Sequence, residues 1–245
     1  IYFFNKLSEI KLNLENINFG NKELKKIDKI ELCNLSFKFN ERAILRNVNL
    51  LIKEPKIICI TGESGSGKST ILDLILRLYE PTAGKILLND ISINEFSKFE
   101  IRSSIGYVTQ NPAIINNTLR ENLKFGLNVD DNYIMNTLNK LGLSDFIAEF
   151  DEGLETIINE DSTNISGGQR KKISLIRIMI RRFDIVLLDE TTGSISEDDE
   201  ERIFNSIKKM SNKIIIVISH RKKTFKLSDE VYQILDNKLV DWKND

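Results

Sequence analysis

The chain has 245 residues, of which 41% are hydrophobic and 29% are charged, a composition that fits one large globular domain with a substantial core. Its 35 Lys and Arg residues nearly balance its 36 Asp and Glu residues, so nothing in the composition argues for a surface that binds nucleic acid. A single His excludes zinc sites built from His, and no apolar run approaches the ~18 residues that a membrane span needs.

The N-terminal part of the chain divides into a linker and two strands. Residues 1–29 are polar, rich in Lys and Asn and poorly periodic, so we expect a linker that opens with one helical turn. Because the chain begins at Ile1 and not at Met, we expect it to be a fragment. Residues 31–39 alternate between polar and apolar and predict a strand, a charged turn follows at 40–42, and a second strand is centred on 48–52.

A continuous apolar strand, residues 56–60, then runs straight into a glycine-rich loop. The apolar spacing becomes helical from Lys68 to Leu78, and Pro81 and Gly84 mark a turn. Further strands are predicted at residues 85–89 and 105–109. The two cysteines, Cys33 and Cys59, lie in apolar stretches and are expected to be buried thiols of a reducing compartment.

The second half of the chain changes character twice. Residues 111–182 carry helical patterns around Leu119, over Tyr133–Leu141 and from Ser166 onward, so we expect a helical insertion without strands. Strands then resume, with a helix at Glu197–Met210 between the first two; they cover residues 185–189, 214–219 and 231–235. Strands alternating with helices predict a mostly parallel sheet that is covered on both faces.

The glycine-rich loop reads GESGSGKST from Gly62 to Thr70 and matches GxxxxGK[ST] without a mismatch. Its glycines allow backbone N–H groups to approach phosphate oxygens, and the helix beginning at Lys68 adds its positive dipole end. Lys68 can reach the β- and γ-phosphates, and Ser69 offers a hydroxyl to Mg²⁺. A chance Gly/Ser loop is the alternative, and the complete string after an apolar strand disfavours it.

Two carboxylates, Asp189 and Glu190, follow the aliphatic strand at the edge where an α/β sheet presents ligands. Asp189 suits the shell of Mg²⁺, and Glu190 can polarise an attacking water. Taken alone, such a pair is as often a salt-bridged surface pair, and the glycine-rich loop tips the balance toward chemistry.

Three further features gain meaning only together. Ser166–Gln169 reads SGGQ at the start of a predicted helix. Taken alone, this segment is an ordinary helix cap. Beside the glycine-rich loop it becomes a second helix start that can bind an anion, and we expect it to serve a nucleotide held by another copy of the chain. Gln110 and His220 each end a predicted strand. Alone, Gln110 is typical of a solvated loop, and His220 is typical of a structural histidine.

In this order, the motifs resemble the nucleotide-binding domain of an ATP-binding cassette (ABC) transporter, over roughly Glu31 to Val240. The resemblance implies an α/β fold: a P-loop NTPase core, an N-terminal antiparallel β subdomain and an α-helical subdomain at about 111–182 within a domain of residues 30–245. It implies that residues 1–29 link to a missing membrane domain upstream. Two such domains close head to tail around two ATP, each between the glycine-rich loop of one copy and the SGGQ segment of the other.

The resemblance also assigns roles to residues, with ATP and Mg²⁺ as cofactors. It implies that Glu190, His220, Lys68 and Gln110 are catalytic. It implies Mg²⁺ ligands at Ser69, Gln110 and Asp189. Phe39 stands where the family has a Tyr that stacks on adenine, and its ring keeps the π-face. The residues implied to bind ATP are Phe39, Gly62, Glu63, Ser64, Gly65, Ser66, Gly67, Lys68, Ser69, Thr70, Gln110, Ser166, Gly167, Gly168, Gln169 and Asp189.

Other segments point to the exporter branch and to two departures from the family. Glu160 resembles a short exporter segment that touches the cytoplasmic loops of the membrane domain, although its usual flanking glycines are Asn159 and Ser162. After the carboxylate pair the family usually reads SALD, whereas Gly193–Ser196 of this chain read GSIS. Ser196 therefore stands where the family has an aspartate that helps to link the two ATP sites.

The sequence is therefore interpreted as the ATPase domain of an ABC exporter, on the cytoplasmic face of a membrane, which is the inner membrane if the cell is bacterial. Its expected partners are ATP, a second nucleotide-binding domain and an ABC transmembrane domain, without nucleic acid. A soluble ABC ATPase of DNA repair or ribosomes is the first rival, and a regulatory module with dead catalysis is the second. Peptides, lipids and drugs all stay open as cargo.

Overall fold

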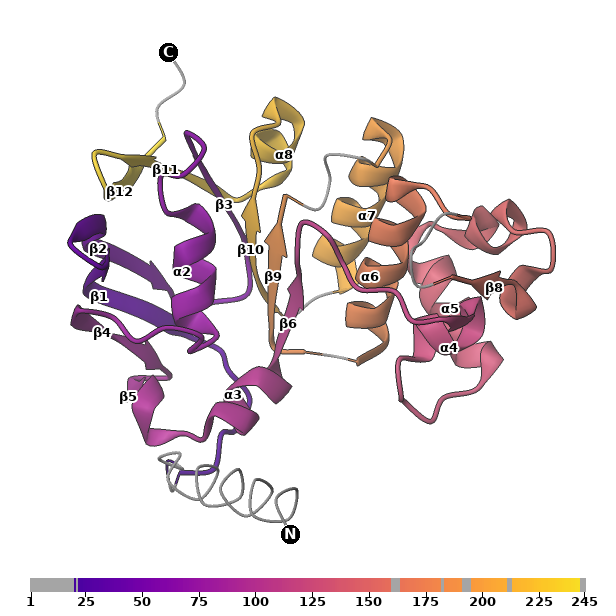
Figure 1. Ribbon diagram of the computed structural model, residues 1–245, viewed down its shortest axis with the longest axis horizontal. Coiled ribbons are helices and arrows are strands. Elements are labelled where there is room, and N and C mark those ends of the chain that lie inside the picture. Colours follow the sequence, from indigo (N-terminus) through magenta and orange to yellow (C-terminus); the bar gives the residue numbers. More distant parts are fainter. Residues whose placement is uncertain are drawn as a thin grey trace, which may run out of the picture.

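A six-stranded sheet runs through the centre of the computed structural model, which describes residues 20, 22–159, 164–181, 183–190, 195–210 and 213–242 (Figure 1). The strand order is β12-β11-β3-β10-β9-β6. The strands are β3 (Ile57–Gly62), β6 (Ile105–Val108), β9 (Ile185–Asp189), β10 (Ile214–Ile218), β11 (Glu230–Leu235) and β12 (Lys238–Asp241). All neighbours pair in parallel except β11 with β12. The carboxyl ends of β3, β6, β9 and β10 therefore meet at one edge of the sheet.

A second, antiparallel sheet of four strands in the order β2-β1-β4-β5 lies beside the first. Its strands are β1 (Ile30–Phe39), β2 (Arg42–Ile52), β4 (Ala83–Leu88) and β5 (Ile91–Ser92). β2 begins earlier than the sequence pattern predicts, because the turn is confined to Asn40 and Glu41. Asn40 takes a left-handed φ of 53°, which Asn tolerates better than most residues, and the chain reverses at once.

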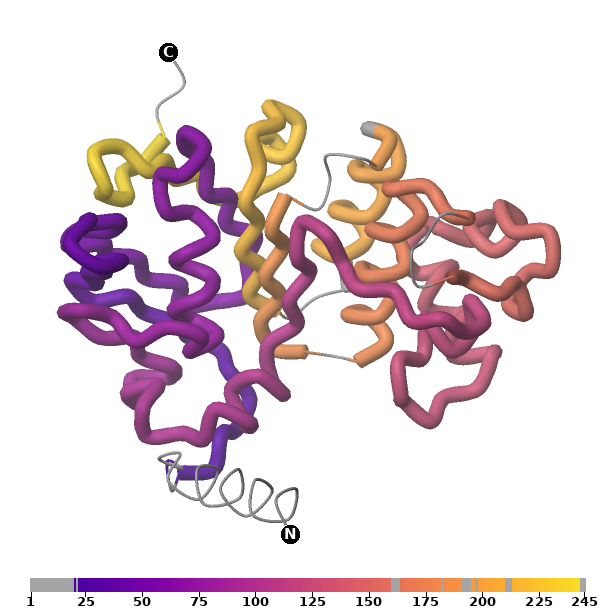
Figure 2. Tube along the Cα trace, viewed as in Figure 1, coloured from indigo at the N-terminus to yellow at the C-terminus, as the bar shows by residue number. Residues whose placement is uncertain are grey.

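The C-terminal hairpin joins the two sheets. Figure 2 shows the yellow C-terminal strands next to the indigo N-terminal ones, and β12 contacts β2. Asn237, in the turn of the hairpin, donates from Nδ2 to the carbonyl oxygens of Ala43 and Ile44, and its own carbonyl accepts from Arg46 N. β12 was not predicted from sequence.

Helices cover both faces of the six-stranded sheet and form the right-hand part of the molecule in Figure 1. The α-helices are α2 (Lys68–Ile75), α3 (Lys98–Ser104), α4 (Leu119–Lys124), α5 (Asp131–Leu141), α6 (Gly167–Arg181), α7 (Glu197–Met210) and α8 (Lys222–Leu227). Short 3₁₀ turns are η1 (Ile93–Glu95), η2 (Ser144–Glu149) and η3 (Gly153–Glu155). α2 ends before the predicted Leu78, because Arg77 has a left-handed φ of 50°.

Within residues 111–182, the expectation of helices without strands is wrong in one detail. β7 (Asn117–Thr118) pairs antiparallel with β8 (Ile157–Ile158), two residues from each side. The pair anchors the start of α4, since Leu119 N donates to Thr156 O at 2.8 Å. Strands of two residues are too short to show an alternating pattern in the sequence.

The six-stranded sheet separates two hydrophobic cores. Alternate residues of β3 pack on opposite faces, with Ile58 and Ile60 in the core beneath α2 and Ile57 and Cys59 in the core beneath α6 and α7. The same alternation holds in β9 and β10, as expected for strands buried on both faces. Cys59 is buried as predicted, whereas Cys33 is only half-buried, because it sits in the partly exposed antiparallel sheet. None of the helices in the described ranges has the length and apolarity to cross a bilayer.

Candidate nucleotide site

The glycine-rich loop leaves β3 and enters α2, as the sequence predicts. Gly67 occupies the N-cap of α2 with a left-handed φ of 104°, and no side chain caps the helix. A Cβ at Gly67 would lie 2.8 Å from Ile44 Cγ2, so glycine is required both by conformation and by space. The backbone N–H groups at the start of α2 are therefore not used by a side-chain cap.

Lys68 is held inside the curve of this loop. Its Nζ donates to Gly62 O at 2.9 Å and to Glu63 O at 2.7 Å. Burial lowers the pKa of Lys68, and the charges of Glu190 and Asp189 oppose that shift. Ser66 supplies a second polar group, because its Oγ is buried and hydrogen-bonds to no described residue. A buried hydroxyl without a partner is costly in a closed protein and useful where a ligand oxygen arrives.

Asp189 ends β9 with 8% of its surface exposed. Burial raises the pKa of Asp189, and hydrogen bonds from Ser69 and Tyr107 oppose the rise. Tyr107 Oη, which comes from β6, donates to Asp189 Oδ2 at 3.3 Å. The Asp189 carboxylate thus lies next to Ser69, at the end of the glycine-rich loop, and the hydrogen bond from Tyr107 of the neighbouring strand helps to fix its position.

Glu190 adopts a strained backbone conformation, with a left-handed φ of 47°. Two main-chain contacts hold it there: Glu190 N donates to Ile218 O at 3.1 Å, and Lys171 Nζ donates to Glu190 O at 2.8 Å. Its carboxylate meets two of the predicted site residues. Gln110 Nε2 donates to Oε2 at 3.0 Å, and His220 Nε2 lies 3.4 Å from Oε1.

The glycine-rich loop, Lys68, Gln110, Asp189 and Glu190 line one cavity of about 310 Å³ at the carboxyl edge of the sheet. Its lining comprises Ile44, Ser64, Gly65, Gly67, Lys68, Ser69, Thr70, Gln110, Asp189 and Glu190. Among the described residues, no group of three or more His, Cys, Asp and Glu side chains is arranged so that it could hold a metal ion by itself. The oxygens of Ser69, Asp189 and Gln110 nevertheless form the sparse, hard donor set that Mg²⁺ accepts when substrate phosphates and waters complete its shell.

The lining does not include the predicted site residues Gly62, Glu63, Ser66 and His220, nor two further groups, Phe39 and Ser166–Gln169. Phe39 ends β1 with 56% of its surface exposed, so its ring is available to a planar ligand. Ser166–Gln169 stands at the start of α6, where Ser166 Oγ accepts from Gln169 N at 3.1 Å and Gln169 Oε1 accepts from Ser166 N at 2.8 Å. The glycines of this segment are exposed or half-exposed and are not among the residues that line the cavity.

Some predictions fall on residues outside the described ranges. Glu160, Ser162, Gly193 and Ser194 are among them. Ser196 lies within the described ranges, directly before α7, and its Oγ accepts from Asp199 N at 3.2 Å. Asn159 N donates to Asn164 Oδ1 at 3.2 Å in an exposed turn.

Sequence reasoning did not single out Tyr107, Lys171 or Ile44 as site residues. Tyr107 lies on the strand that leads to Gln110, and its place near the strand end was the only available signal. Lys171 follows the SGGQ segment within a basic run, which reads as a solvated helix face. Its contact with Glu190 O arises from the packing of α6 on the sheet edge.

Comparisons with known proteins agree with this geometry. Residues 45–193 match the family described as ABC transporter. This chain belongs to the ABC transporter family. It is 34% identical over 216 residues to the ATP-dependent lipid A-core flippase of Syntrophus aciditrophicus, which covers 87% of this chain and 36% of the flippase. It is 36% identical over 216 residues to the mitochondrial iron-sulfur clusters transporter of Kluyveromyces lactis, covering 86% of this chain and 30% of that protein.

A solved structure shares the fold. The bacterial Atm1-family ABC exporter with ATP bound superposes with a TM-score of 0.84 and 25% identity, over 93% of this chain and 40% of that one. The predicted α/β class, with its P-loop core, antiparallel sheet and helical part, is confirmed. The chain is an ABC nucleotide-binding domain of the exporter type, an ATPase domain, and it spans about a third of the length of these relatives.

Proposed function

We propose that this chain powers an ABC exporter by binding and hydrolysing Mg-ATP in the cavity at the edge of the sheet. The observation that carries the proposal is the convergence of Lys68, Gln110 and Glu190 on one cavity, with His220 beside Glu190. These residues come from loops after different parallel strands. Convergence at the carboxyl edge is where an open α/β sheet binds its ligand.

The glycine-rich loop and Lys68 would bind the phosphates of ATP. The ammonium group of Lys68 already lies within the loop, and a phosphate oxygen can replace the carbonyl oxygens of Gly62 and Glu63 as its partner. Ser66 Oγ offers a further donor without a competing described partner. Ser69, Gln110 and Asp189 would hold Mg²⁺, which neutralises charge on the phosphates.

Glu190 is the residue that would orient the attacking water. Its carboxylate is held from one side by Gln110 and faced from the other by His220, so its direction is fixed before substrate arrives. His220 is half-exposed beside Glu190 and would orient the γ-phosphate. Phe39, exposed at the end of β1, would stack on the adenine ring.

The SGGQ segment requires a second copy of the domain in this proposal. Its glycines are exposed or half-exposed at the start of α6, and they do not line the chain's own cavity. A helix start with accessible N–H groups favours an anion. A second domain, packed head to tail, would bring a nucleotide to it and would complete each ATP site from two chains.

A membrane domain is the second proposed partner, and a cleft between β6 and α6 offers it a docking site. The cleft has about 300 Å³ and is mostly apolar, with lining residues that include Pro112, Phe125, Ile178 and Phe183. Arg177 fixes its wall by donating to Ala113 O and to Asn122, so the segment after Gln110 is tied to α4. The relatives extend far beyond this domain, and the extra length leaves room for such a partner. The chain would then act at the cytoplasmic face of a membrane.

Phosphate release from ATP by the purified chain tests the proposal. We expect turnover that saturates with ATP and stops when EDTA removes Mg²⁺. Binding of a fluorescent ATP analogue without any phosphate release, at protein concentrations high enough for two copies to meet, would favour the regulatory module instead. Gln110→Ala is expected to lower turnover more than analogue binding, because its amide holds Glu190 and not the adenosine.

A further inference from the structure

A fully buried carboxylate, Glu200, lies on the first turn of α7 outside the nucleotide cavity. A buried charge is costly unless its partners satisfy it, and Glu200 has such partners. Arg221 Nη1 donates to its Oε2 at 2.7 Å, and Thr224 Oγ1 donates to its Oε1 at 2.6 Å. Both partners belong to the segment that follows β10, so Glu200 attaches that segment to α7.

The same segment carries His220. Ser219 Oγ donates to Thr224 Oγ1 at 2.9 Å and accepts from Arg221 N at 3.1 Å, so the residues on both sides of His220 belong to one hydrogen-bonded unit. Ser219 and Thr224 are buried, and Arg221 is partly buried. His220 itself makes a single described contact of this kind, at 3.4 Å from Glu190 Oε1. Its direction therefore depends on how its neighbours are held.

The network also reaches the chain that follows Glu190. Arg221 Nη1 lies within hydrogen-bond distance of Ile195 O, at 3.3 Å, in addition to its contact with Glu200. Ile195 is buried and directly precedes Ser196, whose side chain caps the N-terminus of α7. Ile195, five residues after Glu190, is thus joined to the segment that carries His220, in addition to the contact between His220 and Glu190.

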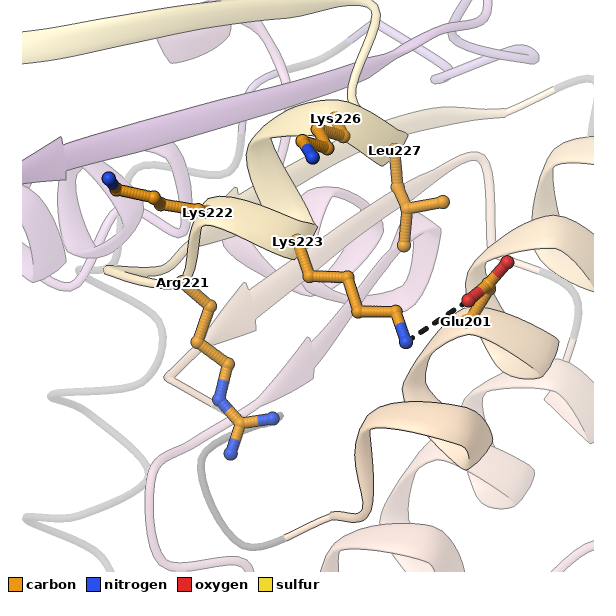
Figure 3. Close-up of a pocket in the computed structure, with 6 residues that line it drawn as sticks. All are labelled: Glu201, Arg221, Lys222, Lys223, Lys226 and Leu227. Atoms are coloured by element: carbon orange, nitrogen blue, oxygen red, sulfur yellow. Dashed lines mark ion pairs between the residues drawn. The ribbon is translucent and has the colours of Figure 1, made fainter.

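A neighbouring ion pair shows what is particular to Glu200. Glu201, the next residue on α7, pairs with Lys223 of α8 at 3.0 Å, but its side chain is 50% exposed. Figure 3 shows Lys223 reaching Glu201 across the gap between the two helices, while Arg221 runs in another direction. Exposed pairs of this kind contribute little to geometry, because solvent screens them and competes for their hydrogen bonds. Glu201 is therefore a matched control.

We propose that Glu200 is a positioning residue for ATP hydrolysis, which fixes the His220 loop through Arg221 and Thr224 and so sets the His220–Glu190 pair. The inference rests on the role proposed above for His220. A catalytic group must be held within a fraction of an ångström, and supporting hydrogen bonds behind it provide that constraint. Loss of the support is expected to impair turnover while the phosphate-binding loop, which Glu200 does not touch, keeps its affinity for ATP.

Kinetics of Glu200→Gln provide the first test. The amide keeps the size of the side chain but replaces one of the two acceptor oxygens with an N–H₂ group and removes the charge, so it can accept from only one of the two donors that Glu200 holds. We expect kcat to fall by about 10-fold with the KM for ATP changed less than about twofold, because the defect is one of alignment. Glu201→Gln is expected to keep wild-type kcat. In a His220→Ala background, Glu200→Gln should have no further effect, since the group that it positions is gone.

Nuclear magnetic resonance of His220 gives a direct reading that does not depend on activity. His220 is the only histidine of the chain, so in protein labelled with ¹³C-histidine its imidazole signals are unambiguous. We expect Glu200→Gln to move or broaden these signals and Glu201→Gln to leave them in place. Thr224→Val, which keeps the side-chain shape and removes one link, should move them in the same direction and serves if Glu200→Gln does not fold.

The outcomes separate the inference from the function on which it rests. Unchanged His220 signals in both Glu200→Gln and Thr224→Val overturn the inference, and so does an equal loss of kcat with and without His220. Displaced signals together with normal kcat in His220→Ala would instead reject the role of His220 in hydrolysis and leave the structural link standing.

Discussion

Two glycine-bearing helix starts in this chain, those of α2 and α6, are built differently. At α2 the N-cap is Gly67, no side chain caps the helix, and Lys68 is buried inside the loop. At α6, Ser166 and Gln169 exchange hydrogen bonds as a capping box, and the segment is exposed. The first start leaves its N–H groups for something outside the protein, whereas the second already satisfies part of its own.

The residues around the two helix starts also differ. The start of α2 shares one cavity with Asp189, Glu190 and Gln110, so in the proposed function one chain would supply both the phosphate-binding and the water-orienting groups. The SGGQ residues at the start of α6 are not part of that lining, although Lys171, one turn further along the helix, donates to Glu190 O. This contrast fits the proposal that α2 belongs to a site that the single chain already preorganises, and that α6 would act only when a second copy is present.

Lys68→Ala should have the largest effect, because it removes the one ammonium group inside the α2 loop. We expect turnover to fall by more than about 10²-fold, the scale of losing a fixed charge at the reacting group. Lys56→Ala is the matched control, since Lys56 precedes the same strand at its opposite end and pairs with Glu230. Phosphate release within a factor of two of the wild type would reject the assignment of the loop.

Glu190→Gln should follow in size. The amide keeps the shape of the side chain but cannot activate water, so we expect about 10²-fold slower hydrolysis with ATP binding retained. Because hydrolysis then no longer separates the two copies, an ATP-bound dimer should accumulate. Light scattering with ATP and Mg²⁺ measures this directly. A chain that stays monomeric at every concentration up to that reached beside a membrane would contradict the proposed closure around two nucleotides.

Gly168→Asp tests the start of α6. A carboxylate in the first turn of a helix favours the fold through the helix dipole, so thermal stability should stay within about 1 kcal/mol of the wild type. The same carboxylate would repel the phosphates of a partner's nucleotide. We therefore expect loss of ATP-driven dimers and of most turnover, with unchanged ATP affinity in the monomer. Weaker ATP binding by the monomer would place α6 in the chain's own site and remove the contrast between the helix starts.

Local patterns explain how much of the fold could be read from the sequence. The aliphatic runs of β3, β9 and β10 are buried on both faces, and nothing in their composition competes with that assignment. α3 and α8, of seven and six residues, were missed because so few turns show little helical period, although α4, which is equally short, was predicted around Leu119. β7 and β8 were missed because strands of two residues show no alternating pattern, and their pairing depends on contacts between distant parts of the chain.

The candidate site divides along the same line. Its motif residues are recognisable because each sits at the end of a strand or the start of a helix. The residues that orient them are not, since their contacts bridge long stretches of chain: Tyr107 and Asp189 are 82 residues apart, and Lys171 and Glu190 are 19 apart. Glu200 likewise resembles any charged residue at the start of a helix until the fold buries it against Arg221 and Thr224.

Ser196→Asp should have the smallest effect on the chain alone and is the finest test of the two-copy arrangement. Ser196 Oγ caps α7 by accepting from Asp199 N, and Asp is an equally good cap, so stability should be unchanged. Ser196 does not line the cavity, so ATP affinity of the monomer should also be unchanged. A carboxylate accepts stronger hydrogen bonds across an interface than a hydroxyl does, and this should raise the cooperativity of ATP hydrolysis in the dimer. Hill coefficients of the two proteins, measured at the same dimer occupancy, provide the comparison. A changed ATP affinity in the monomer, with unchanged cooperativity in the dimer, would mean that this segment serves the α2 site and not the contact between copies.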